Sequence, residues 1–255
     1  MDTAAFLDAL RRETDTMLRI AVDLPMDADV PTCPGWTVRD LLVHTGLVHR
    51  HKADTVLQGL TDQGAETQPE PTGDILEWFG DGIDFMLDAF EESDLSRPSW
   101  TWCGHDHDAS WWVRRMAHET LIHGVDAAVA AGWEPVVDER LAEDGIDEIL
   151  IEMLVGYPEW AEISEGDRTI ELAAPSRSWH LRTCSWSGVS PNTDTAYTDE
   201  PGLTAAEAVE QPNVRIEGSA AALDLWLWGR GPVPDVDGDV SLAEYVRAVA
   251  AQGTQ

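Results

Sequence analysis

The sequence predicts an α+β protein, in which an N-terminal four-helix bundle precedes a smaller C-terminal domain of mixed α/β structure. Up to about residue 133, apolar residues recur at helical spacing in four long segments that proline and glycine separate. Beyond that point, short segments with strand character alternate with helical ones. We therefore expect two domains, residues 1–136 and residues 137–255.

Each expected helix of the bundle is marked by a boundary signal. The first covers about residues 3–24 and stops before a proline-rich connector, and the second begins at Thr37. Thr37 and Asp40 have the spacing of a capping box, and Trp36 stands where a hydrophobic staple would. The third helix covers about residues 73–92, and the fourth about residues 110–131, before Gly132 as a C-cap. The polar, irregular stretch 93–109 predicts a loop.

The C-terminal domain is expected to begin with a helix over about residues 138–154. Strand character follows in RTIELAAP, SWHLRTCSW and NVRIEGS. A helix in SAAALDLWLWGR, a turn rich in proline and aspartate, and a short helix at about 242–251 complete the expected elements.

The charge of the chain is strongly negative. It has 48 acidic and 16 basic residues, a formal net charge of −32. Such a surface repels nucleic-acid phosphates and anionic lipid headgroups, so we expect neither as a partner. Lys52 is the only lysine. We therefore expect any cationic contact to a substrate carboxylate to come from arginine, whose planar fork also suits that role better.

The three cysteines, Cys33, Cys103 and Cys184, are scattered without a CxxC pair. This spacing argues against a disulfide framework and against a cysteine-based zinc site. No apolar run has the form of a signal peptide or a membrane span. The sequence thus predicts a cytosolic protein without a membrane partner. We expect Cys33, which precedes Pro34 at a helix entrance, to be a small buried apolar residue.

The string RRMAHETLIH places a carboxylate and an imidazole one helical turn apart. Glu119 and His123 are four residues apart, so both side chains face one point and can chelate a divalent metal. The string is not the zinc-protease HExxH motif, because His118 points roughly 140° away from His123 on an ideal helix. We expect His118 to be a packing, surface or outer-sphere residue.

A third ligand must come from another helix. His44 is the best candidate, because it lies among the apolar residues of the second helix, with Gly46 reducing the bulk beside it. His51, one heptad later, is a lesser candidate, whereas His49 belongs to a charged stretch. We predict a zinc site of His44, Glu119 and His123, with another divalent metal as the alternative. A tetrahedral catalytic zinc with these three ligands keeps one position open.

A second group of metal-binding residue types falls in the expected loop, at Cys103, His105, Asp106, His107 and Asp108. The alternation without a cysteine pair is not a known ligand spacing, so a polar loop is the better interpretation. This loop could line the entrance to the bundle site.

Three segments resemble the mycothiol-dependent maleylpyruvate isomerase family, whose N-terminal domain is a DinB-like four-helix bundle. They are VPTCPGWTVRDLLVHTGLVHR, RRMAHETLIHGVDAAVAAG and VRIEGSAAALDLWLWGR. The resemblance implies that His44, Glu119 and His123 hold zinc and that Arg230 reaches the active site from the C-terminal domain. An interaction of Arg230 with the helix C-terminus and Gly231 is the alternative. Asp126 suits an outer partner that orients His123.

The resemblance implies mycothiol as cosubstrate and an electrophilic small molecule as substrate. Zinc would bind mycothiol as a thiolate, which adds to the double bond of a maleylpyruvate-like acid; rotation and elimination then give the trans product. Three alternatives stay open: a mycothiol S-transferase, a zinc hydrolase with His51 or His107 as base, and a non-catalytic, metal-stabilised binding module. Monomer and homodimer are both compatible with the sequence.

Overall fold

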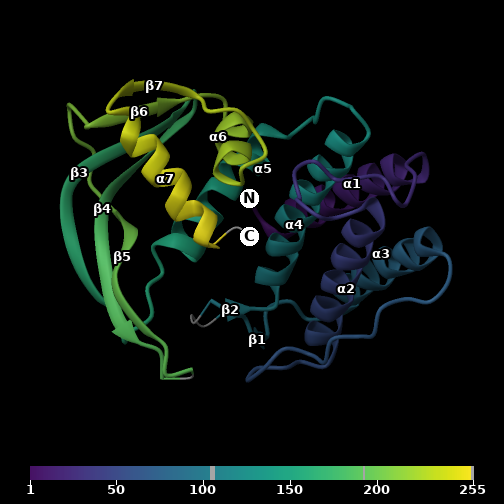
Figure 1. Cartoon of the computed structure of the whole chain (residues 1–255). Coiled ribbons are helices and arrows are strands. Elements are labelled where there is room, and N and C mark those ends of the chain that lie inside the picture. The colour runs from purple at the N-terminus through teal and green to yellow at the C-terminus, as the bar shows by residue number, and fades with distance from the viewer. Residues whose placement is uncertain (104–106, 192, 254–255) are drawn as a thin grey trace. The chain divides into compact units, whose positions relative to one another are not determined.

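The structure is a computed structural model that describes residues 1–103, 107–191 and 193–253. The chain divides into two compact units, Met1–Val137 and Asp138–Gln255. Helices build the first unit and a sheet with accompanying helices builds the second (Figure 1). The predicted α+β class is therefore confirmed. Among the described residues, no helix combines the length and the apolar character that crossing a membrane requires.

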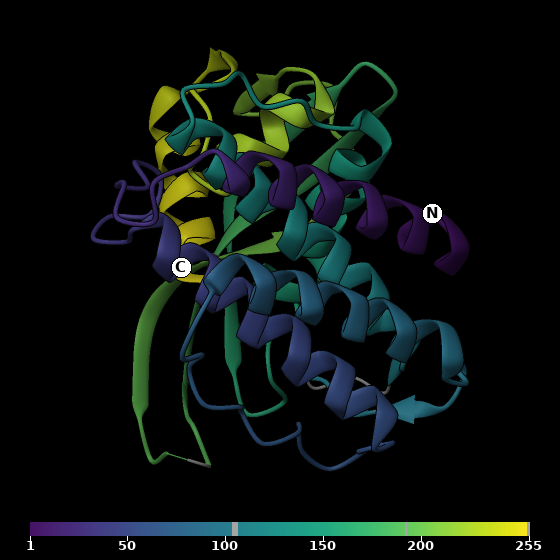
Figure 2. The same cartoon turned by 90° about the vertical axis from the view of Figure 1, so that its right-hand side faces the viewer.

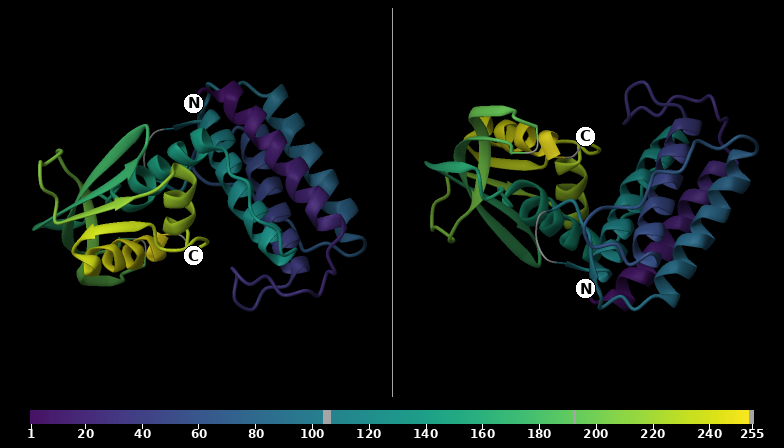
Figure 3. Two further views of the ribbon diagram at one scale, coloured as in Figure 1. Left: turned by 90° about the horizontal axis from the view of Figure 1, so that it is seen from above. Right: turned by 90° about the horizontal axis from the view of Figure 1, so that it is seen from below.

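The first unit is a bundle of four long helices, which Figures 2 and 3 show side by side. Between the third and fourth helices, two short strands pair antiparallel in the stretch expected to be only a loop. The elements are α1 (Thr3–Val22), α2 (Val38–Leu57), α3 (Ile75–Glu92), β1 (Pro98–Ser99), β2 (His107–Asp108) and α4 (Ser110–Ala130).

Helix α2, which carries His44, begins at the predicted capping box. The Thr37 hydroxyl accepts a hydrogen bond from the backbone N–H of Asp40, and the Asp40 carboxylate accepts one from the N–H of Thr37 at 2.9 Å. Two amides at the helix start thus gain acceptors. The cap fixes where α2 begins and so sets which face presents His44.

Helix α4 is the most deeply enclosed helix of the bundle and packs against α1 and α2. Buried residues occur around its whole circumference, and Trp112 is fully buried. A helix with this pattern belongs in an interior. Glu119, His123 and Asp126 therefore project from a helix whose position neighbouring helices hold.

Gly46 makes room for α3 rather than for His44, contrary to our expectation. A Cβ at Gly46 would lie 2.4 Å from the ring of Trp78 and 3.3 Å from Phe79. Two residues along an α-helix is a rotation of about 200°, so Gly46 and His44 face nearly opposite directions. The glycine lets α2 and α3 approach closely.

The second unit is built on a five-stranded sheet in the order β5-β4-β3-β6-β7. Strands β3 and β6 are parallel and the other neighbouring pairs are antiparallel. The helices of this unit lie on one face of the sheet (Figure 1). The elements are α5 (Glu139–Asp147), η1 (Glu148–Leu154), β3 (Glu162–Ala174), β4 (Arg177–Val189), β5 (Ala196–Ala205), β6 (Val214–Glu217), α6 (Ala220–Leu227), β7 (Asp235–Gly238) and α7 (Val240–Gly253).

The sequence pattern missed two strands of this unit and misjudged one helix. Both missed strands, β5 and β7, are the edges of the sheet. They contain aspartate, glycine or proline, residues that the strand pattern disfavours but that protected edges use. The helix expected over 138–154 is α-helical only to Asp147 and continues as the π-helix η1.

Candidate metal centre

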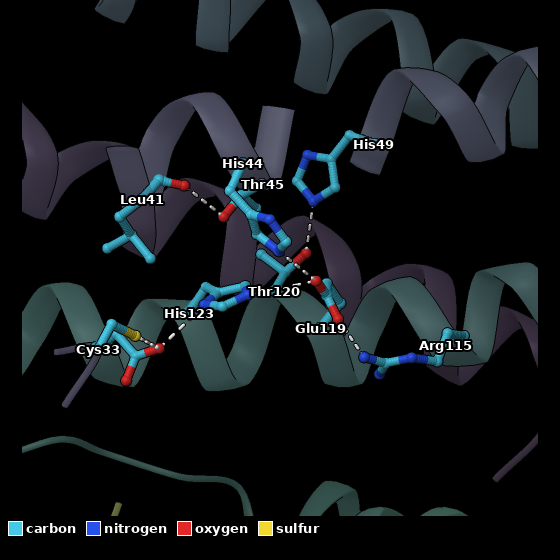
Figure 4. Close-up of polar contacts among 10 residues, drawn as sticks. Cys33, Leu41, His44, Thr45, His49, Arg115, Glu119, Thr120 and His123 are labelled. Carbon is cyan, nitrogen blue, oxygen red and sulfur yellow. Dashed lines mark hydrogen bonds and ion pairs between the residues drawn. The ribbon is translucent and has the colours of Figure 1, made fainter. Parts of the chain in front are cut away.

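Two helices bring His44, Glu119 and His123 together at one point of the bundle. Nε2 of His44 lies 3.4 Å from Oε1 of Glu119, and Nε2 of His123 lies 3.3 Å from the same oxygen. The rings of His44 and His123 are 5.0 Å apart and nearly perpendicular. Figure 4 shows both rings and the Glu119 carboxylate directed toward one another. The helical spacing predicted the Glu119–His123 pair, and the packing of α2 on α4 supplies His44.

The donor set suits a small divalent cation. One candidate ligand atom from each of the three residues lies within 4.8 Å of the others. Tetrahedral zinc with ligands at about 2.0–2.2 Å separates them by roughly 3.3–3.6 Å. The two separations from Oε1, 3.3 and 3.4 Å, meet this requirement. Two imidazoles and one carboxylate are also the ligands of a familiar class of catalytic zinc site.

Arg115 determines which oxygen of Glu119 faces the histidines. It lies one turn before Glu119 on α4 and pairs with Oε2, while Oε1 faces the two imidazoles. Burial raises the pKa of Glu119, but Arg115 and the hydrogen bonds from His123 and His44 hold it well below its ordinary value. Glu119 is therefore ionised at neutral pH, the form in which a carboxylate can bind a metal.

Asp126 contacts the ring nitrogen of His123 that does not face Glu119, as predicted. Its Oδ2 lies 3.0 Å from Nδ1 of His123, and the carboxylate is fully buried. Burial lowers the pKa of His123, yet hydrogen bonds to Asp126 and Glu119 raise it to about 9. A carboxylate on the outer nitrogen of a ligand histidine directs Nε2 toward the metal.

Cys33 has a polar contact in addition to the burial that we expected. Its Sγ donates a hydrogen bond to Oδ2 of Asp126 at 3.3 Å, so this oxygen serves both Cys33 and His123. The connector before α2 also contributes Trp36, whose ring lies 4.9 Å from that of His44 and stacks on that of His123 at 6.2 Å. The connector thus forms one wall of the site.

His49 is a buried neighbour of the site, although its sequence context is charged. Its Nε2 contacts the hydroxyl of Thr120 at 2.9 Å, and its side chain is fully enclosed. Burial lowers the pKa of His49 to about 3. Nothing in the charged string around it indicates this position. The position of Arg115, by contrast, could have been recognised from its four-residue spacing to Glu119.

Several other candidates lie outside this cluster. His118 is buried edge-on against Phe6 of α1, so packing is its role. His51 contacts the ring of Trp100 rather than Glu119 or His123. In the second proposed group, Sγ of Cys103 lies 3.2 Å from Nε2 of His107, whereas His105 and Asp106 lie outside the described residues.

Arg230 belongs to the second unit and follows α6. Its Nη1 donates a hydrogen bond to the backbone oxygen of Trp228 at 2.7 Å, a contact with the end of its own helix. This contact agrees with the helix-terminus alternative. The catalytic role of Arg230 stays a prediction.

Comparison with known proteins places both units in one family. The sequence matches the mycothiol maleylpyruvate isomerase N-terminal domain over residues 7–128 and the MDMPI C-terminal domain over residues 140–245. Crystal structures of a mycothiol-dependent maleylpyruvate isomerase and of its histidine-to-alanine mutant share the fold, with TM-scores of 0.60 and 0.61. Each is 16% identical to this chain, and each alignment covers 92% of this chain and 97% of the other. No curated protein matched the sequence.

Proposed function

The chain belongs to the mycothiol maleylpyruvate isomerase family, and from this membership we propose that His44, Glu119 and His123 hold a zinc ion that activates mycothiol. The thiol would then add to an electrophilic small molecule, as in the cis–trans isomerisation of a maleylpyruvate-like acid. The observation that carries the proposal is the convergence of two imidazole nitrogens on one carboxylate oxygen, at separations of 3.3 and 3.4 Å.

The unequal burial of the ligands supports a site that admits a further ligand. The side chain of His44 is 39% exposed, whereas those of Glu119 and His123 are 13% and 10% exposed. The site is thus closed on the α4 side and accessible beside His44. When bound there, zinc would convert the thiol of mycothiol, with an ordinary pKa of about 8.5, into a thiolate at neutral pH.

The residues around the ligands hold the site in a chelating arrangement. Arg115 occupies the far oxygen of Glu119, Asp126 orients His123, and Trp36 packs against both imidazoles. Such partners restrict the rotamers of the ligands before any substrate arrives, so less ordering is needed on binding. The bundle would therefore present the site preformed.

The isomerisation needs only reversible addition. Addition of a thiolate to the double bond of a cis keto acid leaves a single bond and moves the electron pair onto the keto oxygen. Rotation about that single bond, followed by collapse of the enolate and loss of the same thiolate, gives the trans acid. All atoms of the thiol are recovered. A cytosolic location is part of this proposal.

A cobalt-substituted sample tests the proposal directly. We expect one equivalent of metal per chain and a thiolate-to-cobalt charge-transfer band on titration with mycothiol. Glu119→Gln and His123→Ala should weaken metal binding, whereas His180→Ala, a histidine replacement in β4 of the second unit, should not. Metal binding without a band would refute thiol activation. Activity with zinc alone would indicate a hydrolase instead.

A further inference from the structure

Lys52, the only lysine of this acidic chain, is placed unusually for a cation. It lies on α2, two turns after His44, and is half-buried. Among the described residues, no carboxylate forms an ion pair with it, although the chain has 48 acidic residues. A cation withdrawn from water usually has an anionic partner, because an unpaired buried charge is costly. The position of Lys52 therefore suits an anion that comes from outside the described part of the chain.

Aromatic rings and one imidazole hold the ammonium of Lys52. Nζ lies 4.5 Å from the centre of the Trp112 ring and 5.7 Å from that of Trp100. It also lies within hydrogen-bond distance, 3.0 Å, of Nδ1 of His51. These contacts fix the position of the charge without neutralising it. An ammonium has three donors, so further capacity for an acceptor remains.

This ammonium lies over the same stripe of α4 that carries the candidate metal centre. Trp112, Arg115, Glu119 and His123 follow one another at spacings of three or four residues, so they form one stripe along α4. Burial lowers the pKa of Lys52 to about 8, while the negative charge of Glu119 raises it and the positive charge of Arg115 lowers it. The charge of Lys52 is thus coupled to the site, and the lysine is mostly protonated near neutral pH.

The position of Lys52 over Trp112 and the candidate metal centre at Glu119 are separated by about the length of a small molecule. Trp112 precedes Glu119 by seven residues, which is roughly 10 Å along the helix axis. Arg115 lies between them and already pairs with Glu119. Lys52, which forms no ion pair within the described part of the chain, is accordingly a cation that an incoming anion can use.

We propose that Lys52 binds a carboxylate of the electrophile, so that the substrate class is small organic acids whose carboxylate lies one short chain away from the reacting carbon. This assignment rests on the proposed function, because the reacting carbon must meet the thiol at the centre formed by His44, Glu119 and His123. The ion pair replaces the solvent and ring contacts of the ammonium with a charge-assisted hydrogen bond. It differs from our expectation that arginine would supply this cation.

The proposal is tested by calorimetric titration of succinate, an unreactive dicarboxylate, into zinc-loaded protein saturated with mycothiol. Lys52→Met keeps a long, unbranched side chain at this position but removes the charge. We expect it to weaken succinate binding roughly ten- to hundredfold, the usual effect of losing one charge-assisted hydrogen bond. Lys52→Arg should restore most of the affinity. Neutral succinamide should bind wild type and Lys52→Met equally.

A matched control removes another positive charge from the same helix. Arg39 lies near the start of α2 and pairs with the exposed Glu70. Arg39→Met should leave succinate binding unchanged. Equal succinate affinity of wild type and Lys52→Met would overturn the proposal, as would no binding of succinate to wild type. Zinc content and mycothiol affinity are measured first in every variant. If wild type holds no zinc or does not bind mycothiol, the proposed function is refuted. If Lys52→Met holds zinc and binds mycothiol as wild type does, a loss of succinate affinity reports on the carboxylate contact alone.

Discussion

Oδ2 of Asp126 lies 3.0 Å from Nδ1 of His123, inside the bundle and one turn beyond the candidate metal ligands. The same oxygen accepts the thiol hydrogen bond of Cys33, which comes from the connector before α2. A buried carboxylate without donors would be unfavourable. Asp126 is therefore stabilised by His123, a candidate ligand, and by the connector that carries Cys33.

Asp126→Asn should weaken zinc binding about 10- to 100-fold, the usual effect of losing an outer partner of a ligand histidine. The amide keeps the size of the side chain but removes its charge, so His123 is less basic and less well oriented. A competition titration against a zinc-binding dye measures the change. Asp84→Asn, at an exposed position of α3, serves as control. Equal zinc affinity of Asp126→Asn and wild type would show that the contact only fills space.

The sequence could predict contacts that follow from the geometry of a single helix. Glu119, His123 and Asp126 lie within a stretch of eight residues, so helical spacing alone brings them to one face. Contacts between distant segments depend on how the helices pack. The hydrogen bond from Cys33 to Asp126 and the position of the Lys52 ammonium over Trp112 are of this kind. The edge strands β5 and β7 were missed because the sheet, rather than local strand propensity, determines them.

Gly46→Ala should destabilise the bundle by about 1–3 kcal/mol, because the new methyl group overlaps the Trp78 ring. Urea unfolding of the metal-free protein measures the change. Gly124→Ala on α4 is the matched control. Its Cβ meets nothing within 4 Å, so alanine should stabilise that helix by roughly 0.5–1 kcal/mol. If both substitutions changed the free energy of unfolding by the same sign and amount, helix propensity, not the approach of α2 to α3, would determine the effect.

His49 should make the fold less stable as the pH falls. Burial lowers its pKa in the folded state to about 3, against about 6.5 in the unfolded chain. The unfolded state therefore binds more protons below pH 6.5, and stability is lost as the pH falls from 6.5 toward 3. At pH 5 the loss is about 2 kcal/mol.

The measurement compares urea unfolding of metal-free protein at pH 7 and pH 5. His49→Gln removes the titrating group and keeps a polar partner for Thr120, so its stability should change less over this interval than that of wild type. His180→Gln, in β4, should retain the wild-type change. If His49→Gln and wild type lose the same stability, other groups account for the acid sensitivity.

Arg115→Met should destabilise the metal-free protein by about 3 kcal/mol, because it removes the guanidinium that pairs with the buried Glu119 carboxylate and leaves only the histidines beside it. Both side chains are well buried, at 7% and 13% exposure, so solvent screens their attraction only weakly. The pKa of Glu119, which Arg115 holds well below its ordinary value, should rise. Zinc should recover part of the lost stability, because a cation beside Oε1 replaces the missing charge.

A double-mutant cycle with Glu119→Gln separates this pair from the other contacts of Arg115. We expect Arg115→Met to cost clearly less stability in the Glu119→Gln background, because the neutral amide no longer needs a cation. Urea unfolding of the four proteins, each with and without zinc, provides the energies. If the cost of Arg115→Met is the same in both backgrounds, Arg115 stabilises the bundle through its packing and not by keeping Glu119 ionised for the metal.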